Sequence, residues 1–148
     1  MIYEELYQGL YDLGIIDLIA RGVTYAKSQS AGYMDLVFEV SAQGTSTTPE
    51  GEEYKYTDIY LAHYWELNGD LMSDPLMMVR VWEYEMAEAL SFRQDGLPIP
   101  IIYSYQTIEG VRYVNTKAKK QNNEFLKIWL RNMKNQGHTL KGAQQIVV

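Results

Sequence analysis

The sequence contains no cysteine among its 148 residues. Disulfides, thiolate metal sites and cysteine nucleophiles are therefore excluded. The N-terminus also lacks the basic and unbroken apolar segments of a secretory signal, and nowhere do about 18 apolar residues run together as a membrane span requires. We therefore expect a cytoplasmic protein with no membrane contact.

Several catalytic and nucleotide-binding motifs are missing as well. The chain has no GxGxxG and no GxxxxGK[ST], so no phosphate-cradling loop is visible, and none of its serines lies in a GxSxG elbow. Histidine is scarce, with only His63 and His138 available as a general base. These absences argue against nucleotide-binding folds and serine hydrolases, and no cofactor is predicted.

Basic residues are scarce over most of the chain. Residues 1–110 carry 18 acidic against 5 basic side chains, a net charge of −13, whereas residues 111–148 carry 8 basic side chains against Glu124, a net charge of +7. The total of −6 hides this division. An acidic body favours partners with a basic surface, because electrostatic attraction speeds their association.

The hydrophobic pattern predicts the fold class. A helical period over residues 3–13 gives way to alternating patterns between residues 23 and 114, and a helical period returns from residue 115 or 116 to about 136. We predict a single α+β domain over residues 1–148, with an antiparallel sheet of about five to seven strands and both helices on one face. A polar loop at 43–54 is expected to be mobile, and the tail at 138–148 weakly ordered.

The stretch from Asp58 to Trp82 mixes core-forming and site-forming residue types more densely than any other, and it predicts a central hairpin. Asn68-Gly69 is a strong signal for a two-residue type I′ turn. Such a turn pairs Leu67 with Asp70, Trp65 with Met72, and His63 with Asp74. Alternation then divides the first strand between two faces. The predicted core face carries Ile59, Leu61, His63, Trp65 and Leu67.

The only cluster typical of catalysis is His63 with Asp70 and Asp74. A histidine beside a carboxylate can act as a general base, and one histidine with two carboxylates can hold a divalent ion whose bound water attacks an ester or phosphodiester. The alternative is structural, with a core-edge histidine and two aspartates that stabilise a turn. The spacing matches no known metal motif, so no metal ligand is predicted.

The last helix carries a basic stripe formed by Lys120, Lys127, Arg131 and Lys134. These side chains form a candidate nucleic-acid contact, since lysine and arginine neutralise phosphates. The alternative is a solvated helix face, or one that pairs with the acidic surface of the same protein.

Tyrosine is abundant, with 13 residues that all lie between Tyr3 and Tyr113. Tyrosine favours strands and also provides rigid contact area with a polar tip at binding surfaces. On the solvent-facing side of the central hairpin the candidate binding residues are Tyr60, Tyr64, Glu66, Asn68, Asp70 and Asp74. The alternative is a sheet face on which tyrosine has only a structural role.

Three segments carry a resemblance to a known family: AHYWELNGDLMSDPLMMVRV, EALSFRQDG and NNEFLKIWLRNMKNQGH. Over about residues 57–139 they resemble an uncharacterised bacterial domain of unknown function that phages, plasmids and integrative elements carry. Its pattern is AHYxxxNGDLMxDPxM followed by a C-terminal helix with FLxxWLxNLxxQG. The matching positions are His63, Asn68, Gly69, Asp70, Asp74, Pro75, Arg93, Asp95, Trp129 and Gly137.

The resemblance implies a context and no specific chemistry. Small proteins of mobile elements often act on host or competitor machinery, which favours an anti-defence or other partner-binding role by analogy. Our first expectation is thus a non-enzymatic interaction protein whose partner is a host or competitor protein, including one that itself binds nucleic acid. Direct nucleic-acid binding by the last helix and hydrolysis at His63 are the alternatives.

Overall fold

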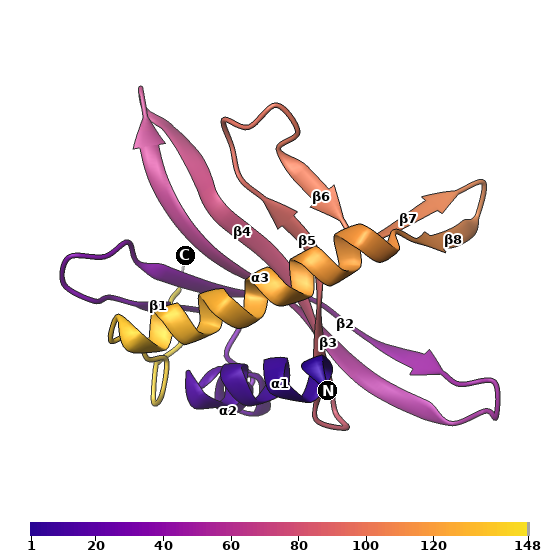
Figure 1. Ribbon diagram of the computed structural model, residues 1–148. Coiled ribbons are helices and arrows are strands. Elements are labelled where there is room, and N and C mark those ends of the chain that lie inside the picture. The colour runs from indigo at the N-terminus through magenta and orange to yellow at the C-terminus, as the bar shows by residue number, and fades with distance from the viewer. Residues whose placement is uncertain (148) are drawn as a thin grey trace.

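Three helices and eight strands make up residues 1–147, the part of the chain that this computed structural model describes (Figure 1). The helices are α1 (Ile2–Asp12), α2 (Ile15–Ala20) and α3 (Thr116–Asn135). The strands are β1 (Tyr25–Ser28), β2 (Leu36–Thr47), β3 (Glu53–Leu67), β4 (Asp70–Trp82), β5 (Met86–Arg93), β6 (Ile101–Tyr103), β7 (Tyr105–Ile108) and β8 (Val111–Val114).

The first six strands form one antiparallel sheet in the order β1-β2-β3-β4-β5-β6, so every strand pairs with its neighbour in sequence. β7 and β8 form a separate two-stranded ribbon. The predicted α+β class, antiparallel sheet and flanking helices are confirmed. Alternating sequence produces this meander because each strand buries one face and short turns join neighbouring strands.

The hydrophobic core lies between the sheet and the helices. Leu6 and Leu10 of α1 and Leu126 of α3 pack in one buried cluster with Phe38 and Leu61 of the sheet. Figure 1 shows the three helices on the same side of the sheet. Phe38 pairs with Leu61, and Leu61 with Met77, so one row of fully buried side chains crosses three strands beneath the helices.

The β3–β4 turn has the predicted type I′ geometry, with positive φ at Asn68 (52°) and Gly69 (85°). The pairs Leu67–Asp70 and Trp65–Met72 form as expected. The predicted one-to-one pairing of His63 with Asp74 does not form. The register shifts between the pairs Tyr64–Ser73 and Ala62–Leu76, so Asp74 and Pro75 together stand opposite His63. A bulge there agrees with proline's lack of a donor N–H.

Strands also replace most of the loop predicted at 43–54. β2 continues to Thr47 and β3 begins at Glu53, with pairs from Gln43–Thr57 to Thr47–Glu53. A short turn closes the hairpin, with the Thr48 N–H donating to the Glu52 carbonyl at 2.8 Å. The segment is polar because both sides of this extension face solvent, and polarity alone does not prevent a threonine-rich segment from pairing.

The tail is packed onto the domain, contrary to the weak order expected for 138–148. His138 and Leu140 are buried, and the Leu140 N–H donates to the Leu13 carbonyl at 2.7 Å. Gly14 permits this approach, since a Cβ there would lie 2.4 Å from the Lys141 nitrogen. The tail forms no strand over residues 138–147. Its last residue, Val148, lies outside the described residues.

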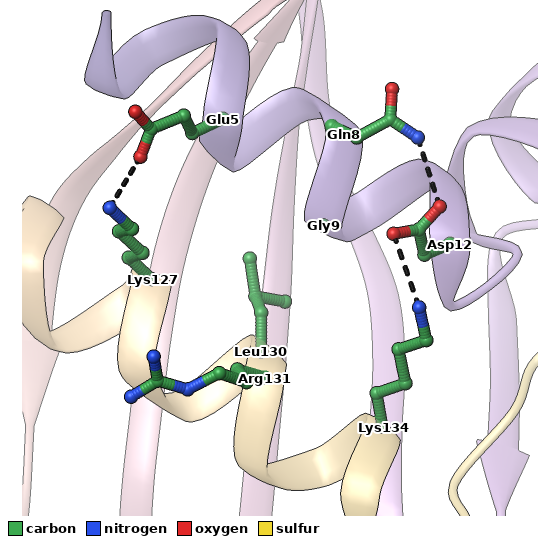
Figure 2. A pocket seen from close by; sticks show the side chains of 8 residues that line it. All are labelled: Glu5, Gln8, Gly9, Asp12, Lys127, Leu130, Arg131 and Lys134. Atoms are coloured by element: carbon green, nitrogen blue, oxygen red, sulfur yellow. Dashed lines mark hydrogen bonds and ion pairs between the residues drawn. The ribbon is translucent and has the colours of Figure 1, made fainter.

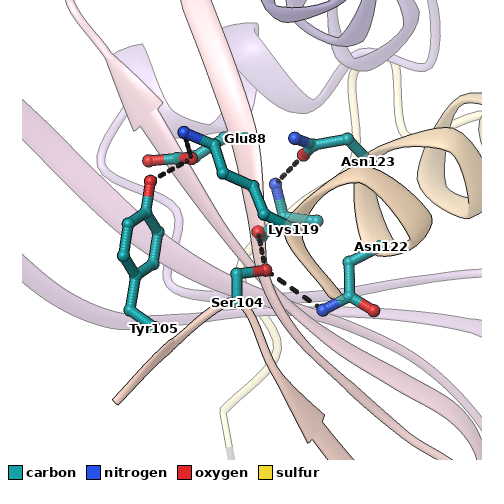
Figure 3. Close-up of polar contacts among 7 residues, drawn as sticks. Glu88, Ser104, Tyr105, Lys119, Asn122 and Asn123 are labelled. Carbon is teal, nitrogen blue, oxygen red and sulfur yellow. Dashed lines mark hydrogen bonds and ion pairs between the residues drawn. The ribbon is translucent and has the colours of Figure 1, made fainter. Parts of the chain in front are cut away.

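Side chains of α3 and the β6–β7 segment close the outer edge of β5 (Figure 3). The Ala89 N–H donates to Asn123 Oδ1 at 2.8 Å, and the Ala89 carbonyl accepts from Ser104 Oγ at 2.9 Å. Asn122 Nδ2 donates to Ser104 Oγ at 3.1 Å. An edge strand leaves such backbone groups without partners unless something covers them. Here two asparagines and a serine complete the hydrogen bonding.

No helix within residues 1–147 is both long enough and apolar enough to cross a membrane.

We predict that Asn123→Ala lowers the free energy of unfolding by about 1–3 kcal/mol, because it leaves the buried Ala89 N–H without an acceptor. Urea denaturation followed by circular dichroism measures this change. Asn132→Ala, on the exposed side of the same helix, is the matched control and should stay within about 0.5 kcal/mol of the parent. Equal stability of the two variants would contradict the role given to Asn123.

Candidate functional site

The sheet face opposite the helices carries a row of tyrosines. Tyr25 pairs with Glu39, Glu39 with Tyr60, and Tyr60 with Met78, so these four side chains cross β1 to β4 on one side. We call Tyr25, Glu39, Tyr60 and Tyr64 the tyrosine face. Tyr60 and Tyr64 are half-buried, on the side of the sheet away from the helices.

The surroundings of Tyr64 favour its neutral hydroxyl. Burial raises the pKa of Tyr64, and the nearby carboxylate of Glu39 and the ring of Tyr25 raise it further. A neutral phenol donates or accepts a hydrogen bond while its ring offers apolar area. The tyrosine face therefore combines apolar contact with hydrogen bonding around a single acidic side chain.

The β3–β4 hairpin extends this surface beyond the helices, toward the upper left of Figure 1. Glu66 pairs with Leu71 on the strand beyond Tyr64, and Leu71 is 63% exposed. Trp65 and Leu67, which were predicted to lie in the core, are exposed by 38% and 45%. The alternation was correct, but the strand is longer than the helix layer that covers it. Asn68 and Asp70 lie exposed at the tip.

His63 does not meet the two aspartates predicted beside it. Its Nδ1 hydrogen-bonds to the Asp35 carbonyl at 2.8 Å, and its ring packs edge-on against Trp129 at 5.2 Å. Asp74 lies at the bulge opposite His63, but Asp70 lies at the hairpin tip, where it pairs with Leu67, so the three residues do not form one cluster. Within residues 1–147 no group of three histidine, aspartate or glutamate side chains is placed to hold a metal ion.

The neighbour of His63 is the second histidine, which the sequence placed in an unpatterned tail. His138 Nε2 donates to the Met34 carbonyl at 3.0 Å, and its Nδ1 accepts from Ser28 Oγ at 2.9 Å. These two bonds define the neutral tautomer. Burial lowers the pKa of His138, and the nearby His63 lowers it further. His138 thus anchors the tail through its two hydrogen bonds, and its ring lies beside that of His63, with centroids 5.9 Å apart.

The basic stripe lies beside a groove of about 330 Å³ between α1 and α3 (Figure 2). Lys127 pairs with Glu5, and Lys134 Nζ lies 3.5 Å from Asp12 Oδ2. Arg131 projects between the two ion pairs and has no ion-pair partner within the described part of the chain; the same is true of Lys120. Two of the four candidate phosphate-binding side chains therefore form ion pairs with acidic side chains of α1.

A buried charge cluster beside β5 was not predicted from the sequence (Figure 3). Glu88 is 4% exposed; it accepts a hydrogen bond from the Tyr105 hydroxyl at 2.8 Å and lies 3.7 Å from Lys119 Nζ. Burial opposes the charged form of Lys119, but its contacts with Tyr105, Tyr3 and Glu88 outweigh this and raise its pKa. Alternation places Glu88 on a strand face, but only the fold brings a lysine from α3 to it.

Comparison with known proteins gives one match. The model of a family described as a domain of unknown function (DUF6908) matches residues 10–139. No curated protein and no solved structure matches the chain.

The buried neutral state of His138 predicts a pH effect on stability. Its pKa is lower in the folded protein than in the unfolded chain, where a histidine titrates near about 6.5. The unfolded chain therefore binds a proton that the folded protein excludes, and the free energy of unfolding falls as the pH drops below that value, by at most about 1.4 kcal/mol per pH unit for one proton.

Urea denaturation between pH 8 and pH 5 tests this effect in the parent protein and in His138→Gln. We expect the variant to be less stable than the parent by about 1–3 kcal/mol at pH 8, because it loses buried hydrogen bonds. The difference in free energy of unfolding should narrow toward pH 5, since only the parent carries the histidine whose protonation favours the unfolded chain. A gap that stays constant over this range would contradict the account.

Proposed function

We propose that this chain, which belongs to the DUF6908 family of unknown function, is a non-enzymatic protein-interaction module that binds through the tyrosine face. The observation that carries the proposal is that all three helices pack on one side of the sheet and leave Tyr60 and Tyr64 uncovered on the other. A sheet face devoted only to solvation normally alternates to polar and charged residues. This one carries aromatic rings instead.

The chemistry of the tyrosine face suits a protein partner. Tyrosine supplies large, rigid contact area with few rotatable bonds, so little conformational entropy is lost on binding. The half-buried rings of Tyr60 and Tyr64 are already restricted by their neighbours. The exposed Leu71 on the projecting hairpin adds apolar area beyond them. Together these features support a continuous contact surface from β1 to the hairpin tip.

The charge of the chain supports a basic partner surface. Residues 1–110 carry a net charge of −13, and Glu39, Glu66 and Asp70 lie on or beyond the tyrosine face. Association driven by such charge is fast and weakens as salt is added. We propose a host or competitor protein as the partner, including one that itself binds nucleic acid.

We also propose that the protein originates from a phage or other mobile element and acts in anti-defence. The support is the AHYWELNGDLMSDP segment, which resembles the pattern of mobile-element proteins, and the small size of the chain. This part of the proposal is an analogy at the level of the family.

The two alternative functions have less support. Hydrolysis would need His63, Asp70 and Asp74 to converge, and they do not form one cluster. Nucleic-acid binding would need free cations on α3, and Lys127 and Lys134 pair with Glu5 and Asp12. Neither alternative is favoured by a specific contact.

The proposal predicts that Tyr60→Ser with Tyr64→Ser weakens partner binding by about tenfold or more, because truncating a central aromatic residue often costs more than about 1 kcal/mol. Quantitative affinity capture from native host cells identifies proteins lost from the variant. Titration of the purified partner at two salt concentrations then measures the affinity.

The matched control is Tyr33→Ser with Tyr113→Ser, which removes two tyrosines that are each 52% exposed and lie outside the tyrosine face. Its partner binding should stay within about twofold of the parent. Equal loss in both variants, or an affinity that does not change with salt, would contradict the proposed surface.

A further inference from the structure

A second concave surface lies between α1 and the turn that joins β4 to β5. It is a groove of about 700 Å³, within the range of roughly 300–1,000 Å³ typical of ligand pockets. Three rings line it, from Tyr7, Tyr11 and Tyr84, and its charged side chains are Glu4 and Glu85. No lysine or arginine lines the groove.

One ring of this groove is held in place by further aromatic contacts. Tyr84 stacks on Trp82 with ring centroids 5.8 Å apart, and packs edge-on against Tyr54 at 4.6 Å. Tyr7 packs partly against the core. Burial raises the pKa of Tyr7, as does the charge of Glu85, so the phenol stays neutral near that acid. The groove thus combines two supported rings with acidic side chains.

Two rings of this groove are open to solvent. Tyr11 is 59% exposed and Tyr84 is 41% exposed, whereas Tyr7 is half-buried and packs partly against the core. Exposed rings beside carboxylates attract cations, because the face of an aromatic ring is negative. The lining supplies both attractions. Glu4 lies 3.8 Å from the N-terminal ammonium of Met1, so Glu85 is the acid of the groove that has no ion-pair partner among residues 1–147.

The protein itself shows how these groups hold a guanidinium. Arg80 lies 3.9 Å over the ring of Tyr56, and its Nε and Nη2 donate to the two carboxylate oxygens of Asp58 at 2.8 and 2.9 Å. A planar guanidinium can stack on a ring and bind a carboxylate at the same time. The groove between α1 and the β4–β5 turn offers the same two kinds of group without the arginine.

We propose that this groove binds an arginine side chain of a basic segment in the partner protein. This inference rests on the proposed protein-binding function and adds the chemistry of the residue that is recognised. The guanidinium stacks on the tyrosine rings while Glu85 or Glu4 accepts its hydrogen bonds. The tyrosine face and the groove are then two separate contacts with one partner.

Titration with defined peptides tests the groove without the natural partner. The probe is a five-residue glycine–serine peptide with one central arginine, and the matched control replaces arginine by citrulline, which has nearly the same shape and no charge. Nuclear magnetic resonance of the tyrosine rings reports binding. We expect the arginine peptide to shift the resonances of Tyr7, Tyr11 and Tyr84, with affinity at least about fivefold higher than the citrulline peptide.

Two variants locate the contact. Glu85→Gln removes a charge without changing shape, and Tyr11→Leu removes an exposed ring, so each should weaken the arginine peptide by about threefold or more. Glu50→Gln and Tyr33→Leu change an exposed acid and an exposed ring elsewhere and should bind like the parent. Equal affinity for the citrulline peptide, or unchanged binding in Glu85→Gln and Tyr11→Leu, would overturn the inference. Equal affinity for a lysine peptide would overturn the assignment to arginine.

The outcome separates this inference from the proposed function. If the arginine peptide does not bind while Tyr60→Ser with Tyr64→Ser still loses the partner, the groove inference fails and the interaction function stands. If the peptide binds as described while no partner is lost from that variant, the groove stands and the tyrosine face fails.

Discussion

The hydrogen bonds between α3 and the edge of β5 determine the arrangement of the rest of the domain. β6 pairs with β5 only from Ser91 to Arg93, so the backbone before it lacks a strand partner. Asn123 and Ser104 bind the N–H and the carbonyl of Ala89 instead. Because a buried unpaired backbone group costs about 1–3 kcal/mol, these bonds fix the position of α3 along β5. The helix α1 packs on α3, which puts all helices on one side.

The same arrangement neutralises much of the positive charge of the last helix within the molecule. Lys119 pairs with Glu88, Lys127 with Glu5 and Lys134 with Asp12. The two exposed pairs, of Lys127 and Lys134, contribute little to stability, but all three pairs reduce the positive potential that phosphates would meet. Glu39 on the tyrosine face and Glu85 in the groove beside Tyr84 have no such ion pair within the described residues, whereas Glu4 lies 3.8 Å from the N-terminal ammonium. The positive charge of α3 is thus partly neutralised, while these two acids keep their negative charge available.

Sequence periodicity predicted the α+β class, the β3–β4 turn and the helix from Thr116, because each depends on local pattern. It failed where a tertiary contact decides. The missing N–H of Pro75 indicates a bulge, but periodicity does not show that Asp74 and Pro75 together stand opposite His63. Asn122 and Asn123 are polar, yet both are buried, because they bind groups of β5 and the β6–β7 segment. Of the candidate site, the strand face that Tyr60 and Tyr64 share was predictable, whereas the absence of a helix over that face depends on where the helices pack.

The proposed binding surface has to stay hydrated in the free protein and still favour contact with a partner. Tyrosine meets both needs, because its ring contributes apolar area while its neutral hydroxyl remains hydrated until a partner replaces the water. Burial and the charge of Glu39 raise the pKa of Tyr64, which favours the neutral hydroxyl further. On this proposal the acid provides long-range attraction, and the rings provide contact area at short range. Leucine in place of tyrosine would lack the hydrated hydroxyl, and further glutamate would lack the apolar ring.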